Sequence, residues 1–501
     1  MYDMEKWLAH IEEGIARGPY AADWDSLSQH ETPRWFRDAK FGIFIHWGVY
    51  SVPAFRNEWY PRSMYIQGTP EFEHHVKTYG PQSQFGYRDF IPMFRAEHFD
   101  PEAWAELFAE AGARYVVPVA EHHDGFQMYR SELSEWNAWE KGPKRDLIME
   151  LMDAAGKRGL LAGASSHRIE HWFFFDHGRD FPSDVPANAE KRGDFYWPSV
   201  RMDEEGIIDD NQIAPAPSKE FLNDWMIRTV EIIDRFHPRE LYFDWWIMHE
   251  AARPYLKKIA AYYYNSAAAR GEEVMIANKN DAFPFGTAVA DTERGSYDRA
   301  QVEPWQTDTA IAKNSWCYTP ENEYKRPGVI LNDLVDAVAK NGSMLLNVGP
   351  KEDGTISDED AAILREIGAW LRVNGEAIYG SRPFRIAEEG PTGPKGGAFA
   401  DRVDTEFTSE DFRFTVNHGR IYVFAMHWPE NGRVNVRSLA RVPHPTQTDF
   451  NALIGNVELL GFANPDGSPR KVCWERNEEG LSIRADGVSS DSPVVFRVTL
   501  K

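Results

Sequence analysis

The chain has 501 residues, 42% of them hydrophobic, and a formal net charge of −23 at pH 7. This charge argues against nucleic acid or an anionic membrane as partner, because both are bound by patches of Lys and Arg. The length allows one large barrel and one smaller domain around a substantial core.

Neither a signal peptide nor a transmembrane helix is predicted. The first 20 residues carry charged side chains and lack the apolar stretch of a signal peptide. No run of 18 apolar residues indicates a membrane span. We therefore expect a soluble protein, cytoplasmic as the sequence is written, or periplasmic or secreted if a signal has been removed. The two cysteines, Cys317 and Cys473, lie far apart and are expected to be unpaired.

Short apolar runs alternate with helical patterns through the first three quarters of the chain, which is typical of a parallel α/β sheet. The predicted strands are Phe41–Ile45, Tyr115–Val119, Leu160–Ala164, Leu241–Phe243, Val274–Ala277 and Met344–Leu346, with two weaker ones at Thr287–Asp291 and Trp316–Tyr318. The predicted helices are Pro101–Ala113, Asp146–Arg158, Lys219–Phe236, Ala252–Arg270, Val329–Lys340 and Asp358–Val373. We expect these elements to form a (β/α) TIM-like barrel.

The pattern changes near residue 380, where turn residues begin to separate short alternating runs. Such runs predict an antiparallel β-sandwich. They are Phe412–Val416, Ile421–Ala425, Val434–Val436, Val457–Leu460, Leu481–Arg484 and Val494–Leu500, and Gly390–Gly397 is expected to be a loop. We therefore predict a catalytic barrel with an N-terminal helical extension over residues 1–380. The sandwich is predicted over residues 381–501, as a packing or accessory domain.

Polar side chains follow nearly every predicted strand of the barrel. His46 follows the first strand, His122 and His123 the second, His167 the third and Asp244 the fourth. The carboxyl ends of the strands of a TIM-type barrel meet at one mouth, where active sites lie. These side chains therefore predict an active site at that mouth.

Glycoside hydrolysis needs two carboxyl groups, one as nucleophile or base and the other as acid. Asp244 is the candidate for the first role, because it ends an apolar strand and is followed by Trp245-Trp246. Glu293 and Glu303 are candidates for the second role. Both are predicted to lie in one long loop region, and their spacing alone does not separate them.

The histidines also admit a metal site as an interpretation. Side chains of adjacent strand residues point to opposite faces, so His122 and His123 do not easily reach one ion. Hydrogen bonds from neutral histidines to sugar hydroxyls fit the pattern better, and we expect no metal and no other cofactor. Aromatic rings stack on sugar rings, and we include Trp59, Trp246 and Trp305 among the candidate substrate-binding residues.

Several segments together form a specific pattern. They are Lys40-Phe41-Gly42-Ile43-Phe44-Ile45-His46-Trp47-Gly48, Glu58-Trp59-Tyr60, His122-His123-Asp124-Gly125-Phe126 and Leu345-Leu346-Asn347-Val348-Gly349-Pro350. This pattern resembles glycoside hydrolase family 29, the α-L-fucosidases. The resemblance implies a barrel, a following sandwich, a retaining mechanism and no metal. It assigns the nucleophile role to Asp244, and it assigns contacts with the fucose ring to His46, Glu58, Trp59, His122 and His123.

The sequence departs from the family pattern at two places. Trp245-Trp246 follows the nucleophile where glycine is commoner, which predicts a wider aromatic wall. In one subgroup the equivalent of Trp305-Gln306 is Trp-Glu, and that Glu is the acid/base, a role that Gln306 is unable to perform. The chain therefore resembles the other subgroup, in which an upstream loop supplies the acid/base and α-1,3/1,4-fucosyl branches are favoured. We choose Glu293 for this role.

The sequence thus predicts a retaining exo-α-L-fucosidase that acts on fucosylated oligosaccharides. Three alternatives stay open. A fucose-binding family member with impaired catalysis is favoured by Gln306. A hydrolase of a related sugar, such as an α-L-galactoside, fits the same residues. A metal hydrolase would use the histidines.

Overall fold

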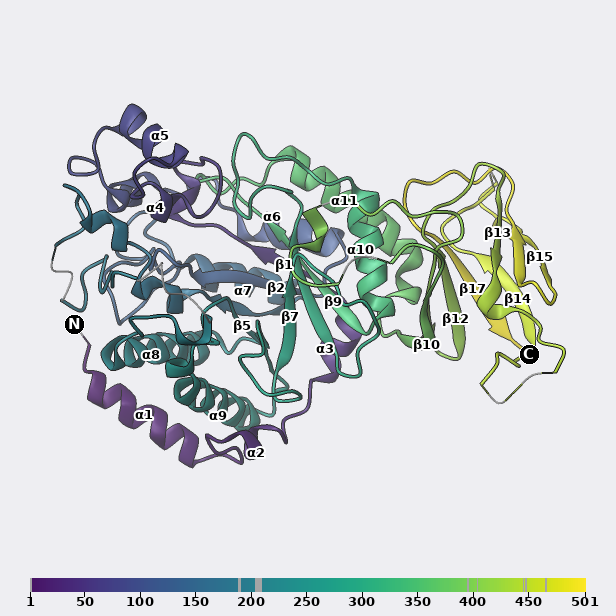
Figure 1. Ribbon diagram of the computed structural model, residues 1–501, viewed down its shortest axis with the longest axis horizontal. Helices are drawn as coiled ribbons and strands as arrows, with labels where there is room; N and C mark the ends of the chain where they lie inside the picture. The colour runs from purple at the N-terminus through teal and green to yellow at the C-terminus, as the bar shows by residue number, and fades with distance from the viewer. Residues whose placement is uncertain are drawn as a thin grey trace.

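The computed structural model describes residues 2–187, 191–202, 210–393, 396–402, 404–444, 446, 448–464 and 466–501. Figure 1 shows a barrel with its surrounding helices in one part of the molecule and antiparallel sheets in the other. Among the described residues, no helix is both long enough and apolar enough to cross a bilayer.

The first part is a closed barrel of parallel strands. Its strands are β1 Phe41–Ile45, β2 Tyr115–Glu121, β3 Leu161–Ala162, β4 Ala164–Ser166, β5 Glu240–Phe243, β6 Met275–Asn278, β7 Val289–Glu293, β8 Trp305–Ala310 and β9 Gly342–Val348. The order is β1-β9-β8-β7-β6-β5-β4-β2-β3, and β1 pairs with β2 to close the ring. Both β3 and β4 pair with β2, so they share one of eight positions. The predicted TIM-like barrel is confirmed.

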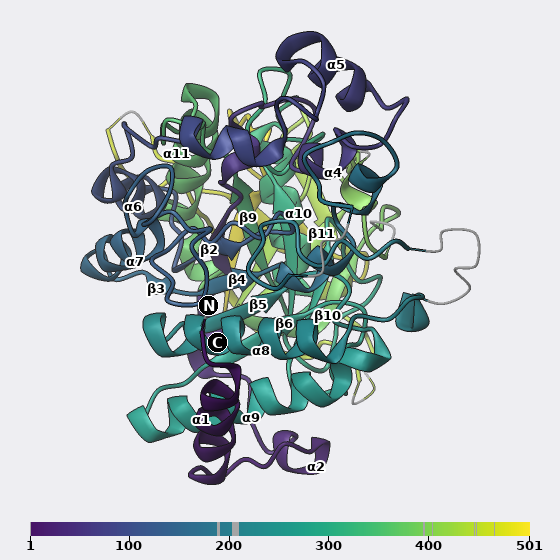
Figure 2. The same cartoon turned by 90° about the vertical axis from the view of Figure 1, so that its left-hand side faces the viewer.

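Helices surround this barrel. They are α1 Met4–Ala16, α2 Trp24–Leu27, α3 Arg34–Ala39, α4 Tyr60–Ser63, α5 Pro70–Tyr79, α6 Pro101–Glu110, α7 Leu147–Lys157, α8 Lys219–Phe236, α9 Arg253–Arg270, α10 Pro327–Ala339 and α11 Asp358–Asn374. The six predicted helices correspond to α6–α11. Figure 2 shows α8 and α9 stacked below the strands, with α1 against them. The Asp100 carboxylate caps α6 by accepting from the N–H groups of Glu102 and Ala103.

Strand β8 lies where no strand was predicted. The prediction of a strand at Trp316–Tyr318 is wrong, because those residues form an irregular loop after β8. The weaker prediction at Thr287–Asp291 matches β7 with a shift of two residues. All six residues of β8 are buried although its middle is polar, so a search for apolar runs misses it.

The second part is a β-sandwich of two antiparallel sheets, as predicted. One sheet has the order β10-β11-β12-β17-β14 and the other β13-β16-β15. The strands are β10 Arg382–Glu389, β11 Phe412–Asn417, β12 Arg420–Ala425, β13 Arg433–Val436, β14 Ile454–Leu459, β15 Cys473–Arg476, β16 Leu481–Arg484 and β17 Val494–Leu500. Side chains from both sheets share one core. The boundary at residue 380 stays a prediction.

Helix α10 packs between the barrel and the sandwich (Figure 1). The Arg413 guanidinium of β11 donates to the Asp336 carboxylate of α10 at 2.6 Å, and Arg413 is fully buried. Lys340 at the end of α10 contacts the other Asp336 oxygen at 2.9 Å. This buried ion network joins the two parts. Cys317 is buried, Cys473 is exposed, and both are free thiols, as expected.

Candidate active site

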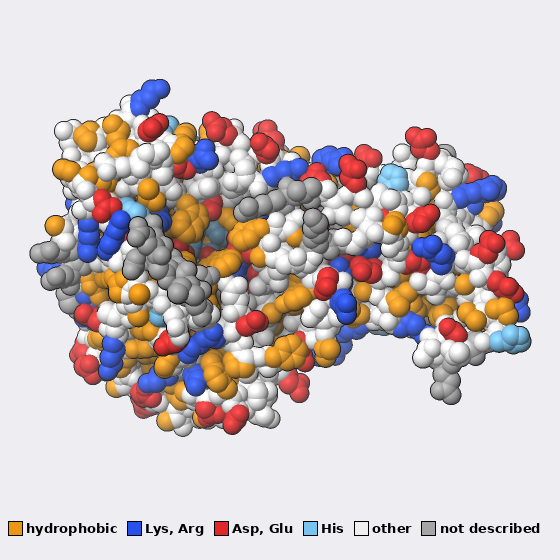
Figure 3. All heavy atoms as spheres, viewed as in Figure 1, with side chains coloured by type: hydrophobic (Ala, Val, Ile, Leu, Met, Phe, Trp, Pro, Cys, Tyr) orange, Lys and Arg blue, Asp and Glu red, His pale blue; other side chains and the backbone are white. Residues whose placement is uncertain are grey.

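A cavity of about 470 Å³ opens at the carboxyl ends of the barrel strands. Figure 3 shows a hollow in the barrel part of this face, bordered by hydrophobic side chains, with histidine inside it. The lining residues that the sequence predicted are His46, Glu58, Trp59, His122, His123, Asp244, Trp246 and Glu293. The structure therefore brings together eight of the nine predicted site residues, and the ninth, Trp305, lies elsewhere.

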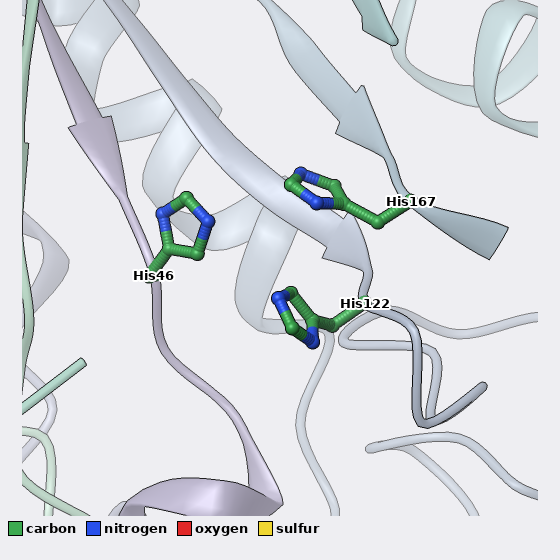
Figure 4. A group of neighbouring side chains, drawn as sticks. All are labelled: His46, His122 and His167. Carbon is green, nitrogen blue, oxygen red and sulfur yellow. The ribbon is translucent and has the colours of Figure 1, made fainter. Parts of the chain in front are cut away.

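Three histidines line the deep part of the cavity. Figure 4 shows His46, His122 and His167 around one shared space, each at the end of a different strand. The ring centroids of His46 and His122 are 5.6 Å apart, and those of His122 and His167 are 5.0 Å apart. Burial lowers the pKa of all three, so they are neutral rings that present hydrogen-bonding groups to a polar ligand.

The same three rings offer nitrogen atoms within 4.8 Å of one another, a spacing compatible with a metal ion. One ring nitrogen of His46 is already engaged, since its Nδ1 lies 2.7 Å from Asn347 Oδ1. The Nδ1 of His167 lies 2.9 Å from the Asp244 carboxylate. The absence of a metal stays a prediction, which loss of activity with a chelator would contradict.

Asp244 follows β5 and lies within a set of nitrogen atoms. Its Oδ2 lies 2.9 Å from His167 Nδ1 and 3.4 Å from His123 Nε2, and its Oδ1 lies 3.7 Å from the Lys279 ammonium. Burial raises the pKa of Asp244, but His167, His123 and Lys279 together hold it well below its usual range. Asp244 is therefore an ionised carboxylate near neutral pH.

His123 is a cation in this site, in contrast to the other histidines. Its Nδ1 lies 3.0 Å from the Glu170 carboxylate, and its Nε2 faces Asp244. Burial lowers the pKa of His123, but Glu170 and the hydrogen bond with Asp244 raise it to about 9. His123 thus holds the Asp244 carboxylate with a charged donor.

Glu293 ends β7 beside the cavity. Its Oε2 accepts from the Lys279 ammonium at 2.8 Å and from the indole N–H of Trp245. Burial raises the pKa of Glu293, Lys279 lowers it, and Asp308 and Asp244 raise it further, with a net rise. A carboxyl group with a raised pKa is suited to hold a proton at neutral pH.

Lys279 lies between Asp244 and Glu293 and also contacts two further carboxylates. Its ammonium contacts Asp308 at 3.1 Å and Asp291 at 3.6 Å, in addition to Asp244 and Glu293. Burial lowers the pKa of Lys279, but the four carboxylates raise it well above its ordinary value. One cation therefore links Asp308 and Asp291 to Asp244 and Glu293.

The sequence matches a known family over most of its length. A family model described as Alpha-L-fucosidase matches residues 7–376. The human tissue α-L-fucosidase is 31% identical over 464 residues, which cover 89% of this chain and 86% of that protein. The chain belongs to the α-L-fucosidase family.

Solved structures of α-L-fucosidases agree with this fold. The crystal structure of the Thermotoga maritima α-fucosidase has a TM-score of 0.72 and 28% identity, covering 96% of this chain and 100% of that chain. A structure of that enzyme in complex with fucose has a TM-score of 0.71 and 28% identity, with the same coverage. As a member of the α-L-fucosidase family, the protein is a glycoside hydrolase.

Trp305 and Glu303 lie away from the site of this α-L-fucosidase family member. Trp305 is the first residue of β8 and is 1% exposed, with its indole N–H donating to the Lys340 carbonyl at 3.0 Å. Glu303 precedes it. The cavity opens at the other end of the strands, so the prediction that Trp305 binds substrate is corrected. For the same reason Glu303 is no longer a candidate for the acid/base.

Gln306 is also remote from the cavity. It lies in the barrel interior, where its amide accepts from the Tyr115 hydroxyl at 2.9 Å and donates to Glu240 at 2.9 Å and Asp291 at 3.1 Å. A carboxylate at this position would not face a substrate. The identity of residue 306 therefore carries no information on the acid/base of this chain, and it no longer favours impaired catalysis.

Sequence reasoning missed several residues that line the cavity or contact its carboxylates. The set is Glu170, Lys279, Asp308, Trp316 and Phe399. Lys279 follows a predicted strand, so its position in the sequence indicated a place at the barrel mouth, although no role was predicted for a lysine there. Phe399 carried none, because it comes from the segment between β10 and β11.

Proposed function

We propose that this protein is a retaining exo-α-L-fucosidase, with Asp244 as nucleophile and Glu293 as acid/base. The observation that carries the proposal is the pairing of these two carboxylates across Lys279. Asp244 and Glu293 are each 9% exposed, whereas the other carboxylates of the lining, Glu58, Glu170 and Asp308, are 5%, 0% and 2% exposed. The first two are therefore the acidic groups best placed to meet a substrate.

The protonation states support the two roles. A carboxylate that stays ionised attacks the anomeric carbon, and a carboxyl that keeps its proton transfers it to the leaving oxygen. The pKa of Asp244 is lowered and the pKa of Glu293 is raised, so one environment suits the attack and the other the proton transfer. In the second step Glu293, now ionised, takes a proton from the water that releases the sugar.

The donors around Asp244 support binding of a neutral sugar. His46, His122 and His167 are neutral and lie deeper than the carboxylates, so they are placed to pair with the hydroxyls of one terminal ring. Glu58 accepts from the Trp316 backbone N–H at 2.9 Å, which fixes it in the lining of the same pocket. The fucose complex of the Thermotoga maritima relative supports fucose as this ring.

The finer part of the proposal is a preference for α-1,3/1,4 branches. The glutamine at position 306 does not support this preference, because Gln306 is buried away from the cavity. The preference is supported by the position of the proposed acid/base, because Glu293 ends β7, upstream of the Trp305-Gln306 pair. Kinetics on trisaccharides with α-1,2, α-1,3 and α-1,4 fucose, beside 4-nitrophenyl α-L-fucoside, would test it. A higher kcat/KM on the α-1,2 substrate would overturn the preference.

The nucleophile is tested by trapping the covalent intermediate. Incubation with 2-deoxy-2-fluoro-α-L-fucosyl fluoride should add one sugar mass to the peptide that contains Asp244, and Asp244→Ala should give no adduct. NMR of a wild-type reaction should show α-L-fucose as the first product, since double displacement retains the configuration. An adduct on another residue, or β-L-fucose first, would contradict the assignment.

The acid/base is tested by azide rescue. Glu293→Ala should lose most activity, and on a substrate with a good leaving group, such as 4-nitrophenyl α-L-fucoside, azide should restore turnover and give an α-L-fucosyl azide. The matched control is Glu303→Ala. Glu303 precedes β8 and lies at the opposite end of the barrel from Glu293, so this variant should keep wild-type activity. Rescue of Glu303→Ala in place of Glu293→Ala would move the role to Glu303. A faster reaction on an α-L-galactoside than on a fucoside would favour the related-sugar alternative.

A further inference from the structure

Phe399 reaches the catalytic cavity from outside the barrel. It lies between β10 and β11, yet it lines the same cavity as Asp244. Its backbone N–H donates to the carbonyl of Glu293 at 2.8 Å, and the N–H of Gly397 donates to the carbonyl of Ser296 at 2.8 Å. The chain around Phe399 is thus hydrogen-bonded along the segment that carries the proposed acid/base.

Further contacts hold this segment in place. The Asp401 carboxylate accepts from the Lys325 ammonium and from the Thr309 hydroxyl at 2.6 Å, and it lies 3.5 Å from the Arg294 guanidinium. A Cβ on Gly295 would lie 2.1 Å from the carbonyl oxygen of Gly397, so only glycine permits this approach. The position of Phe399 is therefore built by several independent contacts.

Four of the aromatic rings that line the cavity fall into two groups. Trp59 contacts His123 with centroids 5.5 Å apart, and Trp316 contacts His46 at 5.1 Å, so these rings border the histidine pocket. Trp245 instead lies nearly parallel to Phe399, with centroids 6.3 Å apart and an interplanar angle of 20°. All four rings are half-buried, whereas the histidines are almost fully buried.

The contact between Trp245 and Glu293 gives the second group its place in the reaction. The Trp245 indole N–H donates to Oε2 of Glu293, the residue that protonates the leaving oxygen under the proposed function. Rings that border this carboxylate lie on the leaving-group side of the scissile bond. We propose that Trp245 and Phe399 form the subsite for the leaving group, a hexopyranose that lays an apolar C–H face on these rings.

This inference rests on the proposed function and deepens it. The terminal sugar occupies the buried histidine pocket, and the next sugar occupies the mouth against Trp245 and Phe399. The segment that follows β10 therefore contributes directly to substrate choice, which gives the predicted packing or accessory domain a part in the active site. Leaving groups without a flat apolar face lose this contact.

The experiment compares wild type and Phe399→Ala on two substrates. One is an oligosaccharide with a terminal α-L-fucosyl branch, and the other is α-L-fucosyl fluoride, whose leaving group has no sugar ring. The fall in kcat/KM should be about tenfold larger for the oligosaccharide than for the fluoride, mainly through KM. Phe285→Ala is the matched control, because Phe285 is 80% exposed and outside the cavity, and both substrates should be unaffected.

A second variant separates stacking from folding. Phe399→Leu keeps an apolar side chain without a planar ring, and it should show the same difference between substrates with a wild-type Tm. An equal fall for both substrates would overturn the subsite and indicate that Phe399 only positions Glu293. An unchanged kcat/KM on the oligosaccharide would also overturn it. Failure of the wild-type protein to hydrolyse either substrate would overturn the proposed function itself.

Discussion

Lys279 joins both proposed catalytic carboxylates in one buried network. Its side chain is 3% exposed, and its ammonium contacts Glu293 at 2.8 Å and Asp244 at 3.7 Å. Asp308 and Asp291 contact it from below, so four carboxylates share one cation. Burial raises the pKa of Asp244 and of Glu293, and Lys279 opposes that rise in both. A single positive charge therefore affects both protonation states that the reaction requires.

Replacement of Lys279 by methionine tests this effect. In Lys279→Met, kcat should fall on the order of 10²-fold, because a buried charge that orients both carboxylates is lost. The pKa of both groups should rise, so both limbs of the pH profile should move to higher pH, the alkaline limb more because Glu293 is the nearer group. The profile of kcat/KM against pH measures both limbs.

Lys258→Met provides the control for this measurement. Lys258 lies on α9 with 41% of its side chain exposed and pairs with Glu12. Its replacement should leave the pH profile unchanged. Unmoved limbs in Lys279→Met would contradict the proposed electrostatic role.

Strand β8 brings polar side chains into the barrel interior. Gln306 and Asp308 point into it, Gln306 toward Glu240 and Asp291, and Asp308 toward Tyr242 and Lys279. Buried polar groups of this kind are costly unless they are hydrogen-bonded. The strand therefore serves as part of the support beneath Lys279.

Gln306→Glu tests the place of this residue. A carboxylate there would face Glu240 and Asp291, and the Lys279 ammonium that contacts Asp291 is already shared with three other carboxylates, so the variant should lose about 3 kcal/mol of unfolding free energy. It should not restore activity to Glu293→Ala, because residue 306 does not reach the cavity. Thermal denaturation of Gln306→Glu measures the loss of stability, with Gln301→Glu, outside the barrel strands, as the control. The turnover of the Glu293→Ala/Gln306→Glu double variant measures the second outcome. Restored turnover would show that residue 306 reaches the substrate.

The two parts of the molecule share a buried ion network as well as the segment that carries Phe399. Arg413 of β11 contacts Asp336 of α10 at 2.6 Å, and its guanidinium also lies 3.4 Å from Glu388 of β10. The Thr415 hydroxyl donates to the Ala377 carbonyl at 2.8 Å. A buried ion network with good geometry resists separation of the parts, because removal of one partner leaves an unpaired charge.

Arg413→Met should therefore lower the unfolding free energy by about 3 kcal/mol, since Asp336 and Glu388 lose a cation that Lys340 only partly replaces. Denaturant unfolding measures this loss. The matched control is Arg433→Met on the exposed side of β13, which should change stability by less than about 0.5 kcal/mol. Equal stability of both variants and wild type would mean that the network does not hold the parts together.

The sequence alone determined the barrel, the sandwich and the family. Strands such as Phe41–Ile45 and helices such as Lys219–Phe236 have the bounds that were predicted, because hydrophobic periodicity is a local property. It also determined that His46, His122, His123 and Asp244 lie together, since the carboxyl ends of parallel strands meet at one mouth.

Only the tertiary structure decided the rest of the site. Glu293 and Glu303 are equivalent by spacing, but β7 ends at the first and β8 begins after the second, which places them at opposite ends of the barrel. Lys279 and Phe399 acquire their roles through contacts between residues distant in sequence. Such contacts depend on how strands register and how a segment beyond the barrel folds back, and no local pattern of side chains encodes them.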